Sequence, residues 1–295
     1  MQSLDETNAD LEGGRVVKDT SNLLGRLLVD QGRIKESDIE SILTYAREKR
    51  VRFGEAATRL RLISSHDLEH AMSAQFEYPY FEKGAGGYSS ELIAAFDPFS
   101  PKGQALRILR AQLLLRWHSE GHRTLAIVGS NEKEGCSYLA ANLAIVFSQL
   151  GQRTLLVDAD LQHARQHKLF GVKNDVGLSA ILVGRASIES VVKELALFRA
   201  LSILPAGAAP PNPGELLGRK ELTGMVMKLR EQYDVVIIDT PPGSANFGAE
   251  MVAGACGSAL VVLRKDYTYF SDATALIRAV RGAGAEVVGS VVSDF

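Results

Sequence analysis

From residue 123 to the end of the chain, short apolar runs alternate with longer stretches of helical periodicity. The runs are rich in Val, Ile and Leu, as in parallel strands that are buried on both faces. The stretches between them repeat apolar residues every three or four positions, as helices that cover a sheet do. The pattern predicts an α/β fold, a mostly parallel sheet with helices on both faces. We expect strands at 124–128, 153–157, 201–204, 234–238, 258–263 and 286–292, and helices at 136–149, 179–197 in pieces, 214–231, 246–254 and 270–282.

The first hundred residues follow a different pattern. Residues 1–20 are polar and acidic, which predicts a disordered tail. Residues 21–82 have helical periodicity and predict a small all-helical domain. Glycines and prolines in 83–100 predict a flexible linker, so that 101–295 forms the second domain.

The helical domain contains an internal repeat. Gly25 and Gly54 are 29 residues apart, and so are Ile34 and Ile63. In each copy a short apolar helix is followed by a turn and by a second helix with polar residues at its N-cap. The two helix pairs are expected to pack their apolar faces on each other.

Composition excludes several classes of protein. A net charge of −2 gives no reason to expect nucleic-acid binding. Two cysteines make no disulfide framework and suit a reducing compartment. The acidic start is unlike a signal peptide, and no apolar run reaches the ~18 residues of a membrane span. We therefore expect a cytoplasmic protein.

One loop of the α/β region has the layout of a phosphate-binding P-loop. It lies between an expected strand and an expected helix, where backbone N–H groups and the helix dipole favour an anion. Cys136 stands where the P-loop pattern Gly-x-x-x-x-Gly-Lys-[Ser/Thr] has its lysine. The candidate nucleotide-binding residues are Gly129, Ser130, Asn131, Glu132, Lys133, Glu134, Gly135, Cys136 and Ser137.

Three aspartates come at the ends of expected strands. Asp158 and Asp160 follow one strand, and Asp239 follows another. Because the carboxyl ends of parallel strands meet at one edge of the sheet, we expect these side chains near the P-loop. Carboxylates and a hydroxyl such as that of Ser137 are ligands that Mg²⁺ prefers, so the pattern predicts a Mg²⁺–nucleotide site.

The chain from 101 to 295 resembles the bacterial tyrosine kinases (BY-kinases), which belong to the larger family of MinD/ParA-type P-loop ATPases. The resemblance is carried by Asp158-x-Asp160 and by the Pro-rich segment 205–217. Gln104, Arg107 and Arg110 resemble the Glu-x-x-Arg-x-x-Arg helix through which these kinases form homo-oligomeric rings.

The resemblance implies an autokinase that transfers the γ-phosphoryl group of ATP to tyrosines and controls exopolysaccharide chain length and export. It implies ATP and Mg²⁺ as cofactors and a membrane polysaccharide copolymerase as partner, which would bring the protein to the inner membrane. Ser137, Asp160 and Asp239 would hold the metal and its waters. Asp158 and Asp160 would be the catalytic carboxylates, with Asp158 orienting or deprotonating the tyrosine hydroxyl.

The helical domain resembles the MshEN-type N-terminal domain of type II secretion and pilus ATPases. With it, the chain looks most like the EpsG-type kinases of exopolysaccharide loci. Some MshEN domains bind cyclic di-GMP through two motifs, which would here involve Arg52, Gly54 and Gly25. The alternative is a helical adaptor that binds no ligand.

The missing lysine leaves three hypotheses open. The first is an active kinase, slowed on the order of 10²–10⁴-fold by the loss of one charged stabiliser, with Lys133 or Arg165 as a substitute cation. The second is a pseudokinase that senses nucleotide or docks on the copolymerase. The third, a MinD/ParA-type positioning ATPase, is disfavoured because the signature lysine of that group is Asn131 here. Cys136 is also a candidate redox-sensitive thiol.

Overall fold

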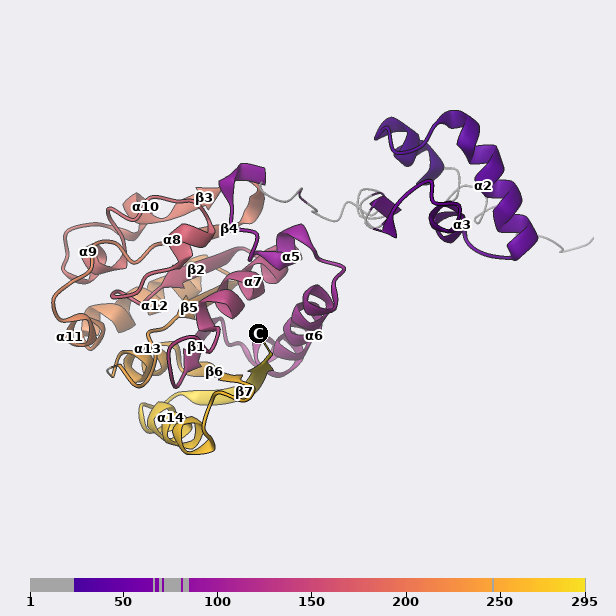
Figure 1. Ribbon diagram of the computed structural model, residues 1–295. Coiled ribbons are helices and arrows are strands. Elements are labelled where there is room, and N and C mark those ends of the chain that lie inside the picture. Colours follow the sequence, from indigo (N-terminus) through magenta and orange to yellow (C-terminus); the bar gives the residue numbers. More distant parts are fainter. Residues whose placement is uncertain are drawn as a thin grey trace, which may run out of the picture. The chain divides into compact units, whose positions relative to one another are not determined.

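The computed structural model describes residues 24–65, 67, 68, 71, 81, 85–245 and 247–294. The chain divides into two compact units, residues 1–80 and 81–295 (Figure 1). The tail predicted at 1–20 lies outside the described residues. None of the helices in the described ranges is long and apolar enough to cross a membrane.

The larger unit is built on one sheet of seven strands in the order β3-β4-β2-β5-β1-β6-β7. Every neighbouring pair is parallel except β3 with β4. The predicted fold is therefore confirmed. The strands are β1 (Thr124–Gly129), β2 (Thr154–Asp158), β3 (Lys193–Leu195), β4 (Phe198–Leu204), β5 (Val235–Asp239), β6 (Ser258–Arg264) and β7 (Glu286–Ser293).

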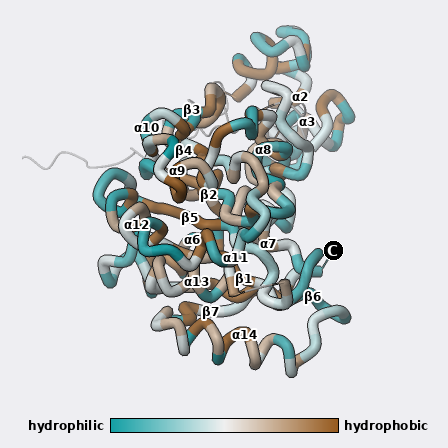
Figure 2. The backbone as a smooth tube through the Cα atoms, turned by 90° about the vertical axis from the view of Figure 1, so that its left-hand side faces the viewer, coloured by the Kyte–Doolittle hydropathy of each residue, from teal (hydrophilic) through white to brown (hydrophobic). Residues whose placement is uncertain are grey.

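Helices cover both faces of this sheet. Along β1, Ala126 and Val128 pack in one hydrophobic cluster, while Leu125 and Ile127 pack in another. Since successive strand residues point to opposite faces, the two clusters are the cores on the two sides, and β5 is hydrophobic along its length (Figure 2). The elements are η1 (Ala85–Gly87), α5 (Ile93–Phe96), α6 (Pro101–Arg116), η2 (His118–Glu120), α7 (Cys136–Ser148), α8 (Gln166–Leu169), α9 (Leu178–Leu182), α10 (Ile188–Val191), α11 (Pro213–Leu217), α12 (Lys220–Gln232), α13 (Gly248–Cys256) and α14 (Phe270–Gly282).

Two predicted helical stretches differ in detail. The stretch 179–197 ends in the short strand β3, which pairs antiparallel with β4 at the sheet edge. Three residues are too few for a periodic signal, which is why the sequence pattern missed this strand. The stretch 214–231 is two helices, α11 and α12, because the chain turns at Gly218.

The described part of the segment predicted as a linker, residues 85–100, belongs to the larger unit and packs in its core. Leu92 and Phe96 are almost completely buried in the cluster that includes α7. The Ala94 N–H donates to Asn142 Oδ1 of α7 at 2.9 Å. Glycines and prolines indicated flexibility, but the apolar side chains between them anchor this segment through burial.

In the smaller unit, equivalent hydrogen bonds occur 29 residues apart, at the spacing of the sequence repeat. Its described helices include α2 (Glu36–Lys49) and α3 (Phe53–Arg59). The Arg33 N–H donates to the Leu28 carbonyl at 2.8 Å, and 29 residues later the Leu62 N–H donates to the Ala57 carbonyl at 3.1 Å. Beyond Leu68, the residues of the second copy other than Ala71 lie outside the described residues.

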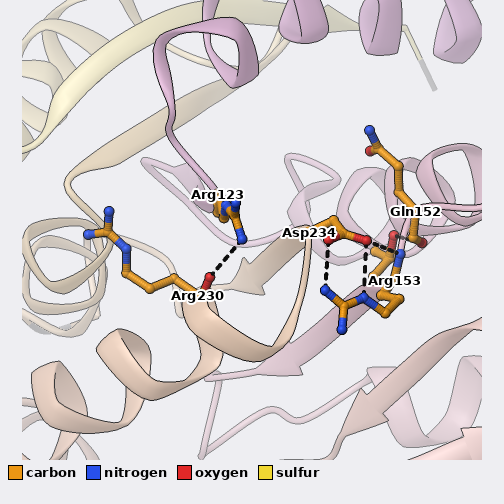
Figure 3. A network of polar contacts seen from close by, with 6 residues as sticks. Arg123, Gln152, Arg153, Arg230 and Asp234 are labelled. Carbon is orange, nitrogen blue, oxygen red and sulfur yellow. Dashed lines mark hydrogen bonds and ion pairs between the residues drawn. The ribbon is translucent and has the colours of Figure 1, made fainter.

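An ion pair lies at the edge of the sheet where the parallel strands begin (Figure 3). Arg153, before β2, lies 3.0 Å from Asp234 Oδ1, before β5, and its N–H donates to Asp234 Oδ2 at 2.9 Å. Hydrogen bonds from Arg153 hold the pKa of Asp234 below its usual range. At this edge the carboxylate of Asp234 is therefore paired with the guanidinium group of Arg153.

Candidate nucleotide-binding site

The P-loop segment connects β1 to α7, as its sequence predicts. Lys133 and Gly135 have φ of 63° and 96°, in the left-handed region that favours glycine. Lys133 thus takes a backbone conformation that costs strain in a residue with a Cβ atom. At Gly129 a Cβ atom would lie 2.5 Å from Cys136 Sγ, so only glycine fits between strand and helix.

A pocket of about 270 Å³ opens beside this loop. It brings Asp160 together with Ser137 and the rest of the loop from Asn131 onward, as predicted. Asp158 and Asp239 are completely buried and do not line it. The sequence reasoning missed three further lining residues, His163, Thr240 and Pro242, because no motif marks them.

Asp158 and Asp239 lie side by side beneath the pocket, as register partners on β2 and β5. Asp158 Oδ2 accepts the backbone N–H groups of Arg165 and Gln166 at 3.0 and 2.9 Å. Its Oδ1 has no hydrogen-bond partner in the described part of the chain. Burial, and then the charge of Asp239, raise the pKa of Asp158 well above its usual range.

Gln166 forms hydrogen bonds with both the P-loop segment and Asp239. Its Nε2 donates to Asp239 Oδ2 at 2.8 Å and to the Ser137 carbonyl at 3.0 Å. Burial raises the pKa of Asp239 to about 7, although hydrogen bonds from Gln166 and Ser137 work against the shift. The sequence gave no signal for Gln166, because a buried amide at the start of a four-residue helix belongs to no periodic pattern.

Asp160 is placed differently from the other two acids. It is 8% exposed, and its Oδ1 accepts the His163 N–H at 2.9 Å, which fixes the turn after β2. It is the carboxylate of the three that reaches the pocket wall. The arrangement is suited to a metal ion at Asp160 and Ser137, with Asp239 supporting Ser137 from below.

The surroundings of Cys136 are acidic. Burial, then Asp239 and Glu134, raise the pKa of its thiol. Since the thiolate is the reactive form, these neighbours argue against the redox-sensitive thiol considered from the sequence. Glu134 is 1% exposed, and its Oε1 accepts from Thr268 at 2.7 Å while its Oε2 has no partner among the described residues.

The two candidate substitutes for the missing lysine, Arg165 and Lys133, differ in their ion pairing. Arg165 lines the pocket but lies 2.5 Å from Glu91, with which it forms an ion pair. Lys133 is exposed, lines the pocket, and has no ion pair within the described ranges. Lys133 is therefore the better placed of the two.

A second, apolar pocket of about 270 Å³ adjoins the loop at Gly135. Leu106 and Leu109 of α6, Leu139 of α7 and Val262 of β6 contribute to its walls. The sequence reasoning did not foresee it, because its walls come from four separated elements. Its size and apolar lining suit a flat ring such as a nucleobase.

The residues proposed to form rings make side-chain hydrogen bonds within their own chain. Arg107 donates to the Pro98 carbonyl, and Arg110 donates to the Val146 carbonyl at 2.7 Å. Gln104 Nε2 donates to the Phe99 carbonyl at 3.1 Å. These bonds fasten α6 to its neighbours, and a role of α6 in oligomerisation stays a prediction.

The proposed cyclic di-GMP residues also have structural roles. A Cβ at Gly54 would lie 2.4 Å from Leu68, and one at Gly25 would lie 3.3 Å from Phe53. Close helix packing therefore accounts for both glycines. Arg52 is the N-cap residue of α3 and makes no side-chain capping bond.

Known proteins are similar to this chain in architecture and in sequence. The AAA domain family matches residues 124–283, which is more than half of the chain. The chain belongs to the AAA domain family. The chain is similar to a putative tyrosine-protein kinase EpsB of Ralstonia nicotianae, with 34% identity over 200 residues, 68% of this chain and 26% of that protein.

A putative tyrosine-protein kinase in the cps region of Klebsiella pneumoniae is 30% identical over 202 residues, 68% of this chain and 28% of that protein. The kinase domain of the Escherichia coli tyrosine kinase ETK superposes on this chain with a TM-score of 0.66 at 29% identity, covering 69% of this chain and 79% of that one. The resemblance to bacterial tyrosine kinases is confirmed, while the chain matches only about a quarter of these curated relatives' length. The MshEN resemblance stays a prediction.

Proposed function

We propose that the chain is a tyrosine-kinase-family component of an exopolysaccharide export system and that it binds MgATP where β1, β2 and β5 end. The observation that carries the proposal is the pocket that joins the P-loop segment to Asp160. It lies at the carboxyl edge of a parallel sheet, where such folds bind ligands. The named kinase relatives support the reaction class.

In this proposal the loop N–H groups and the start of α7 hold the phosphates. Ser137 and Asp160 hold Mg²⁺, with Asp239 beneath them, and the donors are the hard oxygens that this ion requires. Asp239 Oδ1, which has no hydrogen-bond partner among the described residues, is a further acceptor available to a metal-bound water. Asp158, whose Oδ1 likewise has no partner in the described part of the chain, is the proposed base for the tyrosine hydroxyl.

Phosphoryl transfer is expected to be slow. Cys136 brings no positive charge to the phosphates, and one such stabiliser is worth on the order of 10²–10⁴-fold in rate. Lys133 is the proposed substitute, because it lines the pocket without an ion pair in the described residues.

A pseudokinase is the second candidate function. The observation that favours it is Glu134, a buried carboxylate without a cation among the described residues, beside Cys136. Negative charge at this place opposes phosphate binding. Such a subunit would dock on a membrane copolymerase at the cytoplasmic side of the inner membrane and regulate export without transferring phosphate.

The test is an autophosphorylation assay. The purified chain is incubated with radiolabelled MgATP, with and without the cytoplasmic tail of a polysaccharide copolymerase, and blotted for phosphotyrosine. We expect a slow label that Asp158→Ala and Asp160→Ala abolish and that Asp234→Asn, at the other edge of the sheet, leaves unchanged. No label in the wild type, with label in Cys136→Lys, would establish the pseudokinase instead.

Cyclic di-GMP binding by Arg52, Gly54 and Gly25 is a separate proposal for the helical unit. Its support is the sequence resemblance, since close packing already explains the two glycines. Calorimetry with cyclic di-GMP tests it, and the absence of heat at high micromolar ligand would retire the idea.

A further inference from the structure

A hollow of about 340 Å³ lies on the other side of the P-loop segment, against α13 and α14. Two carboxylates, of Glu250 and Asp272, line it together with Ser130 and Asn131 of the loop. Leu276 and two alanines of α14 form an apolar part of the wall. No lysine, arginine or histidine is among the described residues that line it.

Two polar atoms that line the hollow have no hydrogen-bond partner among the described residues. Ser130 is 4% exposed, and its Oγ has no hydrogen-bond partner in the described ranges. Glu250 Oε2 is enclosed and equally without a partner there. Asp272 Oδ2 accepts from a neutral group, Asn131 Nδ2, at 3.2 Å. Enclosed acceptors without donors cost free energy, so the hollow favours a ligand that brings positive charge and N–H donors.

The dimensions indicate an organic cation rather than a bare metal ion. Within the described residues, Glu250 and Asp272 do not belong to a group of three His, Cys, Asp or Glu side chains close enough to share a metal ion; Glu120, His122 and Glu286 form such a group, and they lie elsewhere. The hollow has room for several heavy atoms, and its apolar wall suits a hydrocarbon stem. The carboxylates suit an ammonium or guanidinium head.

We propose that this hollow binds an alkyl cation, with the chemistry of a lysine or arginine side chain or of a free polyamine. The stem packs on Leu276, and the head donates to Glu250 Oε2 and Asp272. The cation then replaces Asn131 as the donor to Asp272 and places positive charge beside the loop that lacks its lysine. The effect on nucleotide rests on the proposed function, whereas the binding of the cation does not.

The experiment is calorimetry on the full chain at low salt, without nucleotide. Agmatine probes a free cation, and an acetylated Gly-Arg-Gly amide peptide probes a side chain of a partner. We expect saturable binding of at least one of them, weakened about tenfold or more in Glu250→Gln, which removes the charge at constant shape. Whichever probe binds more tightly identifies the source.

Two further variants keep the test decisive. Ala275→Phe, at an exposed position of α14 that lines the hollow, should block binding without changing any charge. Glu231→Gln, an exposed acid at the end of α12, should bind both probes like the wild type. Failure of both probes to bind, or equal binding by wild type and Glu250→Gln, would overturn the proposal. Because nucleotide is left out, neither result depends on whether the chain is a kinase.

Discussion

The two ends of β5 carry the same residue type in opposite environments. Asp234, just before the strand, is partly exposed and paired with Arg153, which lowers its pKa. Asp239, the last residue of the strand, is fully buried beside Asp158, and burial raises its pKa to about 7. The ion pair of Asp234 stabilises the folded protein, whereas the buried carboxyl of Asp239 destabilises it when charged. Acids with such shifted pKa values often lie at functional sites.

The same contrast holds for the two edges of the sheet. At the amino edge, where the parallel strands begin, Asp234 is paired with Arg153. At the carboxyl edge, Asp158, Asp239 and Glu134 are buried without an ion pair within the described residues. The difference supports the proposal that the carboxyl edge binds ligands that bring positive charge, such as Mg²⁺. The predictions below add or remove charge at one edge at a time.

The largest effect is expected from Cys136→Lys. The new ammonium group would neutralise phosphate charge, so we predict phosphoryl transfer faster by on the order of 10²–10⁴-fold. The measurement is the initial rate of phosphotyrosine formation from MgATP. Cys136→Met is the matched control, because it has a long stem without charge. An equal gain in both variants would show that packing rather than charge limits the site.

Asp239→Asn should stabilise the protein while impairing function. Because the folded-state pKa of Asp239 lies above its unfolded value, the folded protein holds more protons between about pH 4 and pH 7. The free energy of unfolding therefore falls as pH rises through that window. The substitution should therefore raise the free energy of unfolding by about 4 kcal/mol at pH 8 and change it little at pH 4.

Urea unfolding of wild type and Asp239→Asn at the two pH values measures this difference. A variant that is less stable than the wild type at pH 8 would mean that the Asp239 carboxylate is compensated in the folded protein. That result would remove the contrast between the two ends of β5.

Asp234→Asn should have the smallest effect. The ion pair with Arg153 is partly exposed, and such pairs contribute little to stability. We expect a decrease in Tm of at most a few degrees and unchanged phosphoryl transfer. Differential scanning calorimetry with the autophosphorylation assay checks both. A loss of activity would show that the two edges are coupled.

The sequence predicted the sheet well because its strands are buried on both faces, so that each is an uninterrupted apolar run. It also predicted the P-loop segment and the three aspartates, since both are local motifs at strand ends. It did not distinguish Asp160, which reaches the pocket, from Asp158 and Asp239 beneath it. That distinction depends on how the turns after the strands fold.

Features that depend on contacts between distant segments were out of reach of the sequence. Gln166 joins Ser137 to Asp239 across 29 and 73 residues. Leu92 and Phe96 anchor a segment whose glycines and prolines predicted a linker. The strand β3 exists because β4 lies beside it, and not because of its own three residues.

The most direct test of the central claim is calorimetric titration of MgADP into the full chain. If the carboxyl edge is a Mg²⁺–nucleotide site, the wild type binds one equivalent weakly, Asp160→Asn and EDTA abolish the binding, and Asp234→Asn leaves it unchanged. Binding that persists unchanged in EDTA and in Asp160→Asn, or its absence in both wild type and Cys136→Lys, would contradict the account.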